Sequence, residues 1–418
     1  MKDLSPARRA YIASSVRSAV DLAFAHWEAT GGLDLEGAYQ KLLDSTIGRG
    51  DRNHFSLEMS AFLASLKNGH TFYLDPVGWK PLGGSLGFRA APIGRDWVVE
   101  ESWSPEVRAG EVLERIDGTT PHDFYQDRQR FISGSSEDAR KRHLTALPRL
   151  FPRRVSLQTQ GRRWTLRRVP GRREPPRERT RGRWLRRGKV AYLRIPSFGA
   201  PDHERRAIEL THHFQQASTI VIDVRGNTGG STPTLLLPRL MDRPWRGWAF
   251  STPQRVGFVR AHVHLLDLLE RGEGDGFNLT KERLAPLEPL REWDGLQAWF
   301  PSGAHRPEKG SYRGRLIALA DRRCGSACED FLMPLKDTGR ATLVGSTTCG
   351  STGQPYILDF PEGLRAFVGT KRAHFPDGSP FEGIGITPDL EVFAAREDLL
   401  AGRDPVLERA IELASALG

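Results

Sequence analysis

Two runs of apolar residues in the second half of the chain constrain its fold most strongly. Residues 219–224 read Thr-Ile-Val-Ile-Asp-Val and residues 315–320 read Arg-Leu-Ile-Ala-Leu-Ala, without the alternation of a strand that faces water on one side. Such runs are typical of a parallel sheet that helices cover on both faces. Residues 190–195 predict another strand, and residues 203–216 and 326–336 predict helices. We therefore expect an α/β domain here.

The rest of the sequence divides into regions of different periodicity. At 418 residues the chain exceeds the usual length of one domain. Residues 1–75 show helical periodicity, whereas residues 76–170 alternate short strand-like runs with turns. Residues 171–187, with two adjacent prolines and few apolar residues, predict a basic linker before an α/β core at 188–418. The expected fold is a multi-domain α/β protein with a helical N-terminal domain and a β-rich second domain.

Composition excludes several classes of protein. Hydrophobic residues make up 38% of the chain, and no stretch approaches the roughly 18 uncharged apolar residues of a membrane helix. The three cysteines, Cys324, Cys328 and Cys349, are too few for a disulfide scaffold and are not spaced as zinc ligands. The N-terminal residues lack the unbroken apolar stretch of a signal peptide. We expect a cytoplasmic protein without a metal, or a secreted or periplasmic one if a leader was removed.

The net charge of +10 is concentrated in one stretch. Residues 140–189 hold 19 lysines and arginines against only Glu174 and Glu178. Such an arm could bind phosphate backbones, but only three aromatic side chains are interleaved with it. We favour a solvated linker and sheet edge over nucleic-acid binding, and the role of the stretch stays open.

Glycine-flanked ends of two buried strands are the best candidates for chemistry. Residues 223–230 (Asp-Val-Arg-Gly-Asn-Thr-Gly-Gly) can expose backbone N–H groups. Ser326 follows the strand at 315–320 and begins a helix, so the N–H of Ala327 points to where an oxyanion would form. A lone serine in this position is more often a helix cap, so the assignment needs further support.

Four motifs, in order along the chain, resemble those of the tail-specific or C-terminal-processing serine peptidases. This family also includes the tricorn core protease and the retinoid-binding repeats of the retina. The matching segments are 223–230, 326–329 (Ser-Ala-Cys-Glu), 339–345 (Gly-Arg-Ala-Thr-Leu-Val-Gly) and 382–389 (Glu-Gly-Ile-Gly-Ile-Thr-Pro-Asp). The resemblance implies a crotonase- or ClpP-like catalytic core, Ser326 as nucleophile and no cofactor. It implies peptides or unfolded protein tails as substrates, and it leaves a homo-oligomer open.

The same resemblance suggests a PDZ-like module at residues 76–170. Ser85-Leu86-Gly87-Phe88 is similar to a carboxylate-binding loop, and residues 107–118 are similar to the strand region that accompanies it. Leu86, Gly87 and Phe88 are therefore expected to bind the C-terminus of a peptide. A glycine-rich turn without a ligand is the alternative.

The sequence departs from the bacterial branch of the family at the residue expected to act as general base for Ser326. Counting 25 residues from Ser326, where that branch has a lysine, arrives at Ser351, so no Ser–Lys pair is available there. The tricorn-like branch uses a histidine that precedes the PDZ domain, and His70 in Lys67-Asn68-Gly69-His70-Thr71 stands in that position. A histidine base needs a partner that fixes its tautomer. By family position this partner is Glu382. Glu329 of the nucleophile helix and Ser351 are expected to be supporting residues.

We therefore expect a serine endopeptidase. Ser326 attacks the scissile carbonyl, His70 accepts its proton, Glu382 orients His70, and Ala327 together with Gly229 or Gly230 stabilises the oxyanion. The main alternative is a catalytically silent relative that binds peptides or apolar ligands. The remaining histidines, such as His212, His262 and His374, lack partners at metal-ligand spacing.

Overall fold

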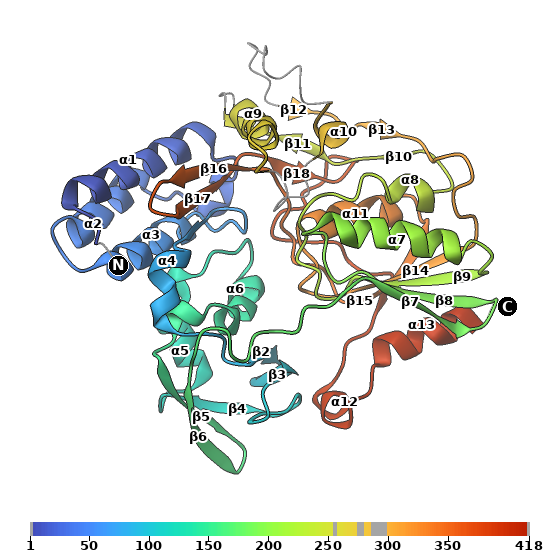
Figure 1. Ribbon diagram of the computed structural model, residues 1–418, viewed down its shortest axis with the longest axis horizontal. Coiled ribbons are helices and arrows are strands. Elements are labelled where there is room, and N and C mark those ends of the chain that lie inside the picture. The colour runs from blue at the N-terminus through green and yellow to red at the C-terminus, as the bar shows by residue number, and fades with distance from the viewer. Residues whose placement is uncertain (1–2, 254–256, 274–279, 286–298, 416–418) are drawn as a thin grey trace.

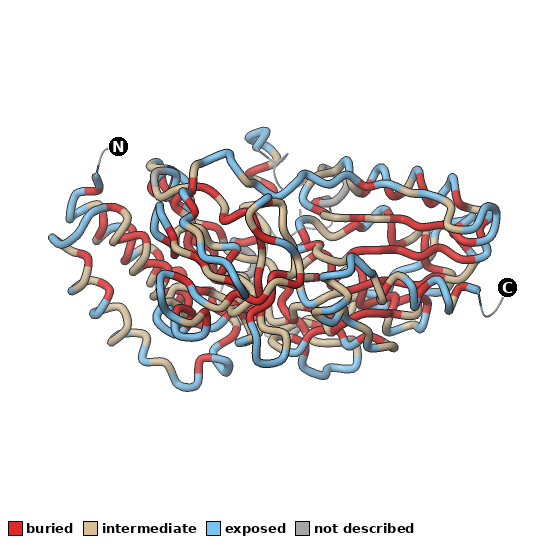
Figure 2. The backbone as a smooth tube through the Cα atoms, turned by 90° about the horizontal axis from the view of Figure 1, so that it is seen from below, coloured by how far each residue is buried: buried red, intermediate tan, exposed pale blue. Residues whose placement is uncertain are grey.

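The computed structural model describes residues 3–253, 257–273, 280–285 and 299–415. Figure 1 shows N-terminal helices, a small β-rich region below them and a helix-covered sheet on the other side. Buried backbone runs through the interior of each region, and exposed residues line their outer edges (Figure 2). Within the described ranges, no helix combines the length and the apolar character needed to cross a membrane.

The large sheet confirms the α/β expectation. Its strand order is β19-β15-β14-β9-β8-β7, and all neighbours are parallel except β7 and β8. The strands are β7 (Arg181–Arg186), β8 (Val190–Arg194), β9 (Thr219–Asp223), β14 (Arg315–Ala320), β15 (Ala341–Gly345) and β19 (Leu390–Glu391). The covering helices are α7 (Pro201–His213), α11 (Ala327–Asp337) and α13 (Pro405–Ser415).

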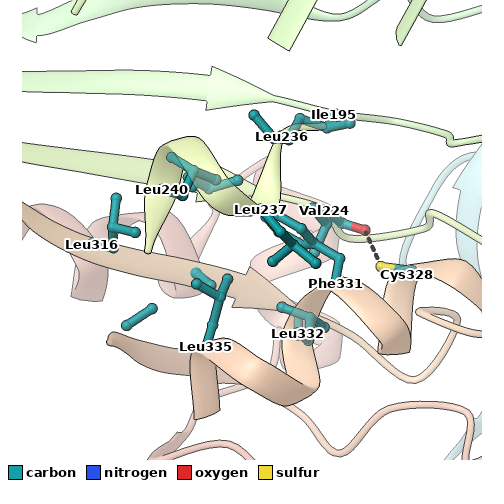
Figure 3. Packing of buried hydrophobic residues seen from close by; sticks show 14 of the residues in the cluster. Ile195, Val224, Leu236, Leu237, Leu240, Leu316, Cys328, Phe331, Leu332 and Leu335 are labelled. Atoms are coloured by element: carbon teal, nitrogen blue, oxygen red, sulfur yellow. Dashed lines mark hydrogen bonds between the residues drawn. The ribbon is translucent and has the colours of Figure 1, made fainter. Parts of the chain in front are cut away.

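Both faces of this sheet are buried, which explains the missing alternation in the sequence. Ile220 and Leu316 point to one face and share a core with Phe331 of α11. Figure 3 shows Leu316 and Phe331 in this core. Val221 and Ile317 point to the other face and pack with residues of α13. Because successive side chains of a strand alternate between faces, apolar residues are needed at every position.

The expected linker at 171–187 is only partly correct. Residues 181–186 form β7, which extends the sheet at its edge beside β8. Arg181 and Arg183 are exposed, whereas Trp184 lies half-buried against Phe214. An edge strand tolerates outward arginines, and these arginines made the strand look like linker in the sequence.

The N-terminal helices do not close a core of their own. They are α1 (Pro6–Ala23), α2 (Leu35–Thr46) and α3 (Arg52–Ala64), and each begins after a Ser or Asp side chain that caps a backbone N–H. Their core is completed by a three-stranded sheet of β1 (Phe72–Leu74), β17 (Leu364–Gly369) and β16 (Pro355–Phe360). Figure 1 shows this C-terminal hairpin lying against α1. Two of the three strands therefore come from the expected α/β core.

The region at 76–170 is β-rich, as expected, with its own hydrophobic core. Its elements are α4 (Pro76–Trp79), β2 (Phe88–Ile93), β3 (Asp96–Ser102), β4 (Leu113–Ile116), α5 (Pro121–Arg128), α6 (Glu137–His143), β5 (Arg154–Thr159) and β6 (Arg162–Arg167). Strands β2 and β3 pair with each other, and β4, β5 and β6 form a second small sheet.

The α/β region has further elements outside the large sheet and its covering helices. They are α8 (Leu237–Leu240), β10 (Trp245–Arg246), β11 (Ala249–Ser251), α9 (Gly257–Glu270), α10 (Lys281–Leu284), β12 (Trp299–Phe300), β13 (Ala304–His305), β18 (Arg372–His374) and α12 (Arg396–Ala401). Two of them, β11 and β18, pair antiparallel just beside the site described next.

Candidate active site

Ser326 lies on a strained turn between β14 and α11. Its backbone has φ 55° and ψ −127°, a conformation that a residue with a side chain adopts only when its surroundings enforce it. The Ser326 N–H donates to the Ser351 carbonyl at 2.8 Å, and the Glu329 carboxylate lies 3.2 Å from the same N–H. This strand–turn–helix geometry is the one that presents a nucleophilic hydroxyl above a parallel sheet.

His70 meets Ser326 although the two residues are 256 positions apart. His70 Nε2 lies 3.0 Å from Ser326 Oγ. The histidine follows α3 in a loop fixed by Asn68, whose Oδ1 accepts the backbone N–H of His70 at 3.0 Å. Directly after this loop, β1 pairs with β17, with Phe72 opposite Phe367. The site thus joins the N-terminal helices to the sheet domain.

Glu382 does not touch His70 directly, because Ser351 lies between them. His70 Nδ1 is 3.0 Å from Ser351 Oγ, and Ser351 Oγ donates to Glu382 Oε1 at 2.8 Å. The same Oε1 also accepts from Asn68 Nδ2 at 2.8 Å and from Ser135 Oγ. The link between Glu382 and His70 is therefore indirect and passes through the Ser351 hydroxyl.

The hydrogen bonds define the tautomer of His70. When Glu382 is ionised, its carboxylate only accepts, so the single proton of the Ser351 hydroxyl goes to Glu382. Ser351 Oγ then accepts from the Nδ1–H of His70, and Nε2 keeps its lone pair facing the Ser326 hydroxyl. This is the arrangement that a general base requires.

Burial shifts the pKa values of both titratable groups. It lowers the pKa of His70 to about 4, which Asp330 opposes and Lys371 reinforces. It raises the pKa of Glu382 to about 7, against the hydrogen bonds from Ser135 and Ser351. At neutral pH the free site therefore holds a neutral imidazole beside a carboxyl group close to its titration midpoint.

Glu329 holds the loop that carries Ser351. Its buried carboxyl group accepts from the N–H groups of Gly350 and Ser351 at 2.7 and 3.0 Å, and from Thr348 Oγ1. Burial raises the pKa of Glu329 to about 8. Glu329 contacts the nucleophile turn and the 348–351 loop, so the structure places it where the sequence expected a supporting residue.

Two backbone N–H groups beside Ser326 are available to an oxygen. In the described part of the chain, the N–H groups of Ala327 and Gly230 have no acceptor, whereas the N–H of Gly229 donates to Asn227 Oδ1 at 2.9 Å. Gly229 has φ 99°, and a Cβ atom there would lie 2.7 Å from Ser326 Cβ and 2.9 Å from the Ala327 nitrogen. The glycine keeps this space open.

A cavity of about 700 Å³ opens at Ser326 and His70. Its lining includes apolar side chains, among them Phe72, Ile357 and Phe367, and the charged side chains of Arg142 and Arg323. The cavity is large enough for several residues of a peptide.

Leu86, Gly87 and Phe88 lie away from this cavity. Leu86 and Phe88 are buried in the core of the 76–170 region. The Gly87 N–H donates to Ser85 Oγ at 3.1 Å, and its carbonyl accepts from the Trp103 N–H. Their assignment as a peptide-binding loop stays a prediction.

Sequence reasoning missed Ser135, Asp330 and Lys371. Ser135 Oγ accepts from the Gly69 N–H at 2.8 Å and donates to Glu382. Asp330 accepts from Trp248 Nε1 and Thr352 Oγ1, and Lys371 lies behind the site with its ammonium over the ring of Phe250. Ser135 sits in the run Ser-Gly-Ser-Ser at 133–136, which is indistinguishable from an ordinary polar loop.

Comparison with known proteins finds similar peptidases. The sequence model of Peptidase family S41 matches residues 189–392. The chain is 24% identical over 234 residues to the tricorn protease of Thermoplasma acidophilum, covering 54% of this chain and 17% of the relative. It is 23% identical over 218 residues to carboxyl-terminal-processing peptidase 3 of Arabidopsis thaliana chloroplasts, covering 51% of this chain and 34% of the relative. The chain thus spans only a part of the length of these curated relatives.

Solved structures extend the similarity of fold to nearly the whole chain. Mature CPAF superposes with a TM-score of 0.67 at 18% identity and 94% coverage of both chains. The photosystem II D1 C-terminal processing protease superposes with a TM-score of 0.51 at 17% identity, covering 92% of this chain and 93% of that one. The matched sequence model identifies residues 189–392 with Peptidase family S41, and the relatives and the shared fold agree with that match.

Proposed function

We propose that this chain is a serine endopeptidase that cleaves peptides or unfolded protein tails through an acyl-enzyme. The observation that carries the proposal is the 3.0 Å approach of His70 Nε2 to Ser326 Oγ. Burial keeps the imidazole neutral at physiological pH, so its lone pair is available to the hydroxyl.

The proton moves within one hydrogen-bonded chain. Ser326 Oγ forms a bond to the scissile carbonyl carbon while its proton passes to His70 Nε2. The resulting imidazolium donates through Nδ1 to Ser351, which donates to the Glu382 carboxylate. The proton on Nε2 then goes to the leaving amine as the C–N bond breaks. A water molecule repeats the sequence on the ester and releases Ser326.

In this proposal Glu382 acts on His70 through the Ser351 hydroxyl. Its charge stabilises the imidazolium and holds Ser351 in the orientation that fixes the tautomer. Asn68 and Ser135 keep the carboxyl group in place. Glu382 is therefore a positioning residue, and Ser326 and His70 are the catalytic residues.

The oxyanion is assigned to the N–H groups of Ala327 and Gly230. Both lie beside the nucleophile, and neither is used by another described acceptor. A donor of this kind contributes about 3 kcal/mol to the transition state. Of the two glycines expected from the sequence, Gly229 shapes the space and Gly230 supplies the donor.

We assign residues 76–170 to a PDZ-like module that presents substrate to a crotonase-like catalytic core. In support, Arg89, Arg142 and His143 of this region line the same cavity as Ser326. The names of two relatives, a tricorn protease and a carboxyl-terminal-processing peptidase, fit polypeptide substrates. The cytoplasmic location expected from the sequence stays a prediction.

Labelling with a fluorophosphonate probe tests the proposal. Wild type is expected to react at Ser326, identified by mass spectrometry of the modified peptide, and both Ser326→Ala and His70→Ala are expected to lose labelling. His212→Ala, at an exposed histidine of α7, is the matched control and should label like wild type. Labelling that survives in His70→Ala would reject the base. A wild type that neither reacts nor cleaves an unfolded protein would favour the silent binding protein instead.

A further inference from the structure

A second and larger recess adjoins the active-site cavity. It has a volume of about 1280 Å³ and lies between strands β2 and β3 on one side and β8 and the start of α7 on the other. Residues 175–180, the remaining part of the basic linker, form its outer wall. Six arginines line it: Arg89, Arg177, Arg179, Arg194, Arg206 and Arg323. We call this recess the arginine groove.

The positive charge of the arginine groove is only partly neutralised. Its three acidic side chains each have an arginine partner: Glu101 pairs with Arg323 at 2.6 Å, Glu178 with Arg194 at 3.0 Å and Asp202 with Arg205 at 2.9 Å. Arg177 and Arg179, in contrast, form no hydrogen bond or ion pair with any residue that the structure describes, and both are exposed. Two guanidinium groups therefore face the groove without a counter-charge.

The arginine groove shares a wall with the cavity that holds the nucleophile. Arg89 and Arg323 line both recesses. Arg323 lies three residues before Ser326, and Gly226 of the groove follows β9, the strand beside β14. The groove and the nucleophile therefore lie close together, on either side of Arg89 and Arg323.

We propose that the arginine groove binds an acidic stretch of the polypeptide substrate at a distance from the scissile bond. The inference rests on the proposed peptidase function and names a class of substrate for it. Guanidinium groups bind carboxylates through paired hydrogen bonds, so Arg177 and Arg179 can each hold an Asp or Glu side chain. Adjacent prolines at 175 and 176 limit the conformations of the segment that presents them.

A polypeptide fits the arginine groove better than a nucleic acid does. Proteins that bind single strands interleave basic side chains with open aromatic faces. The aromatic ring of the groove is Trp103, which carries the Arg89 guanidinium over it and donates its Nε1–H to the Arg173 carbonyl.

Direct binding tests the arginine groove without any catalysis. The Ser326→Ala chain is titrated with three fluorescent probes: a peptide with a run of Asp and Glu, a peptide of equal length with Asn and Gln, and a single-stranded oligonucleotide. We expect Arg177→Glu/Arg179→Glu to weaken binding of the acidic peptide about tenfold at low salt, and the effect to disappear at 1 M salt. The control is Arg154→Glu/Arg167→Glu, which makes the same change of charge on exposed, facing residues of β5 and β6 outside the groove.

Cleavage then connects the arginine groove to the active site. Peptides with an acidic extension before or after the scissile bond are compared with a neutral peptide. The kcat/KM for the acidic peptide, divided by the kcat/KM for the neutral peptide, should fall about tenfold in Arg177→Glu/Arg179→Glu. It should stay unchanged in the β5–β6 control. Acidic-peptide binding without cleavage by the wild type would leave the groove intact and reject the peptidase function. Efficient cleavage without any acidic preference, an equal loss in both double variants, or tighter binding of the oligonucleotide would overturn the groove proposal.

Discussion

The nucleophile and its base belong to two differently built parts of the molecule. Ser326 follows a central strand of the sheet and is fixed by backbone contacts, since its own N–H is bonded to the Ser351 carbonyl and Gly229 packs against it. His70 comes from the N-terminal region, and side chains such as Asn68 and Ser351 hold it in place. The nucleophile is thus held by backbone groups of the sheet domain, whereas the base depends on side chains from separate segments. Changes on the base side should therefore act on His70 and leave the Ser326 turn formed.

The largest expected effect tests whether the two parts act as one unit. Ser326→Ala and His70→Ala should each lower kcat by about 10⁶-fold, and the double variant should lose no more than either single variant. His212→Ala serves as the control. The hydrolysis rates of one peptide by wild type, the two single variants and the double variant measure this. Losses that multiply in the double variant would show that the two residues work independently.

The next effect isolates the nucleophile side. In Gly229→Ala, the added Cβ atom would lie 2.7 Å from Ser326 Cβ and would occupy the space beside the Ala327 N–H, so kcat should fall about 10³-fold. Gly188→Ala is the matched control, because Gly188 also has a positive φ, 71°, but no atom within 4 Å of the added group. An equal loss in both variants would assign the effect to backbone strain alone.

A smaller effect isolates the base side. Glu382→Gln removes the charge that stabilises the imidazolium through Ser351, and kcat/KM at pH 8 should fall about 10²-fold. In wild type, kcat/KM should rise with pH through about 7, where Glu382 loses its proton. In the variant, kcat/KM should not rise near pH 7. It should rise only near pH 4, where His70 loses its proton. Identical pH profiles for the two proteins would contradict the role of Glu382, and Glu412→Gln on the exposed surface of α13 is the control.

The smallest effect concerns the stability of the docked N-terminal region. His26 is buried with Nε2 3.1 Å from the Lys371 carbonyl, and burial lowers its pKa to about 3. The unfolded histidine takes up its proton near pH 6.5, so folding free energy is lost as the pH falls from 6.5 towards 3. Between pH 6.5 and 5 this amounts to about 2 kcal/mol.

Urea unfolding of wild type and His26→Gln at pH 7.5 and pH 5 measures this contribution. The variant should lose less stability on acidification than wild type. The same loss in both proteins would place the acid sensitivity elsewhere, for example at the other buried histidines, His70 and His143, whose pKa values burial also lowers.

The same contrast explains what the sequence could predict. Strands 219–223 and 315–320 were predictable because burial on both faces demands an unbroken apolar pattern. The pair Asp404-Pro405 is typical of a helix start, and in the structure the Asp404 carboxylate accepts the Leu407 N–H at the start of α13. Ser326 was predictable for the same reason, since a local strand–turn–helix pattern presents it.

Contacts between the regions were much harder to predict from the sequence. Residues 355–369 contain two short apolar runs around a Pro-Glu-Gly turn, which is typical of a hairpin. Nothing in this pattern indicates that the hairpin completes the core of the N-terminal helices. Ser351 and Ser135 are ordinary loop serines until the fold brings them to Glu382. The position of His70 was suggested by a family pattern, but its indirect link to Glu382 depends on contacts between residues hundreds of positions apart, which periodicity does not encode.

The protonation state of His70 tests the account most directly. In protein labelled with ¹⁵N-histidine, nitrogen shifts at pH 8, assigned by comparison with His70→Gln, report which ring nitrogen carries the proton. We expect a proton on Nδ1, a bare Nε2 facing Ser326, and no titration of this ring near pH 6.5. A proton on Nε2, or a ring that titrates like an exposed histidine, would contradict the relay from Ser326 through His70 and Ser351 to Glu382.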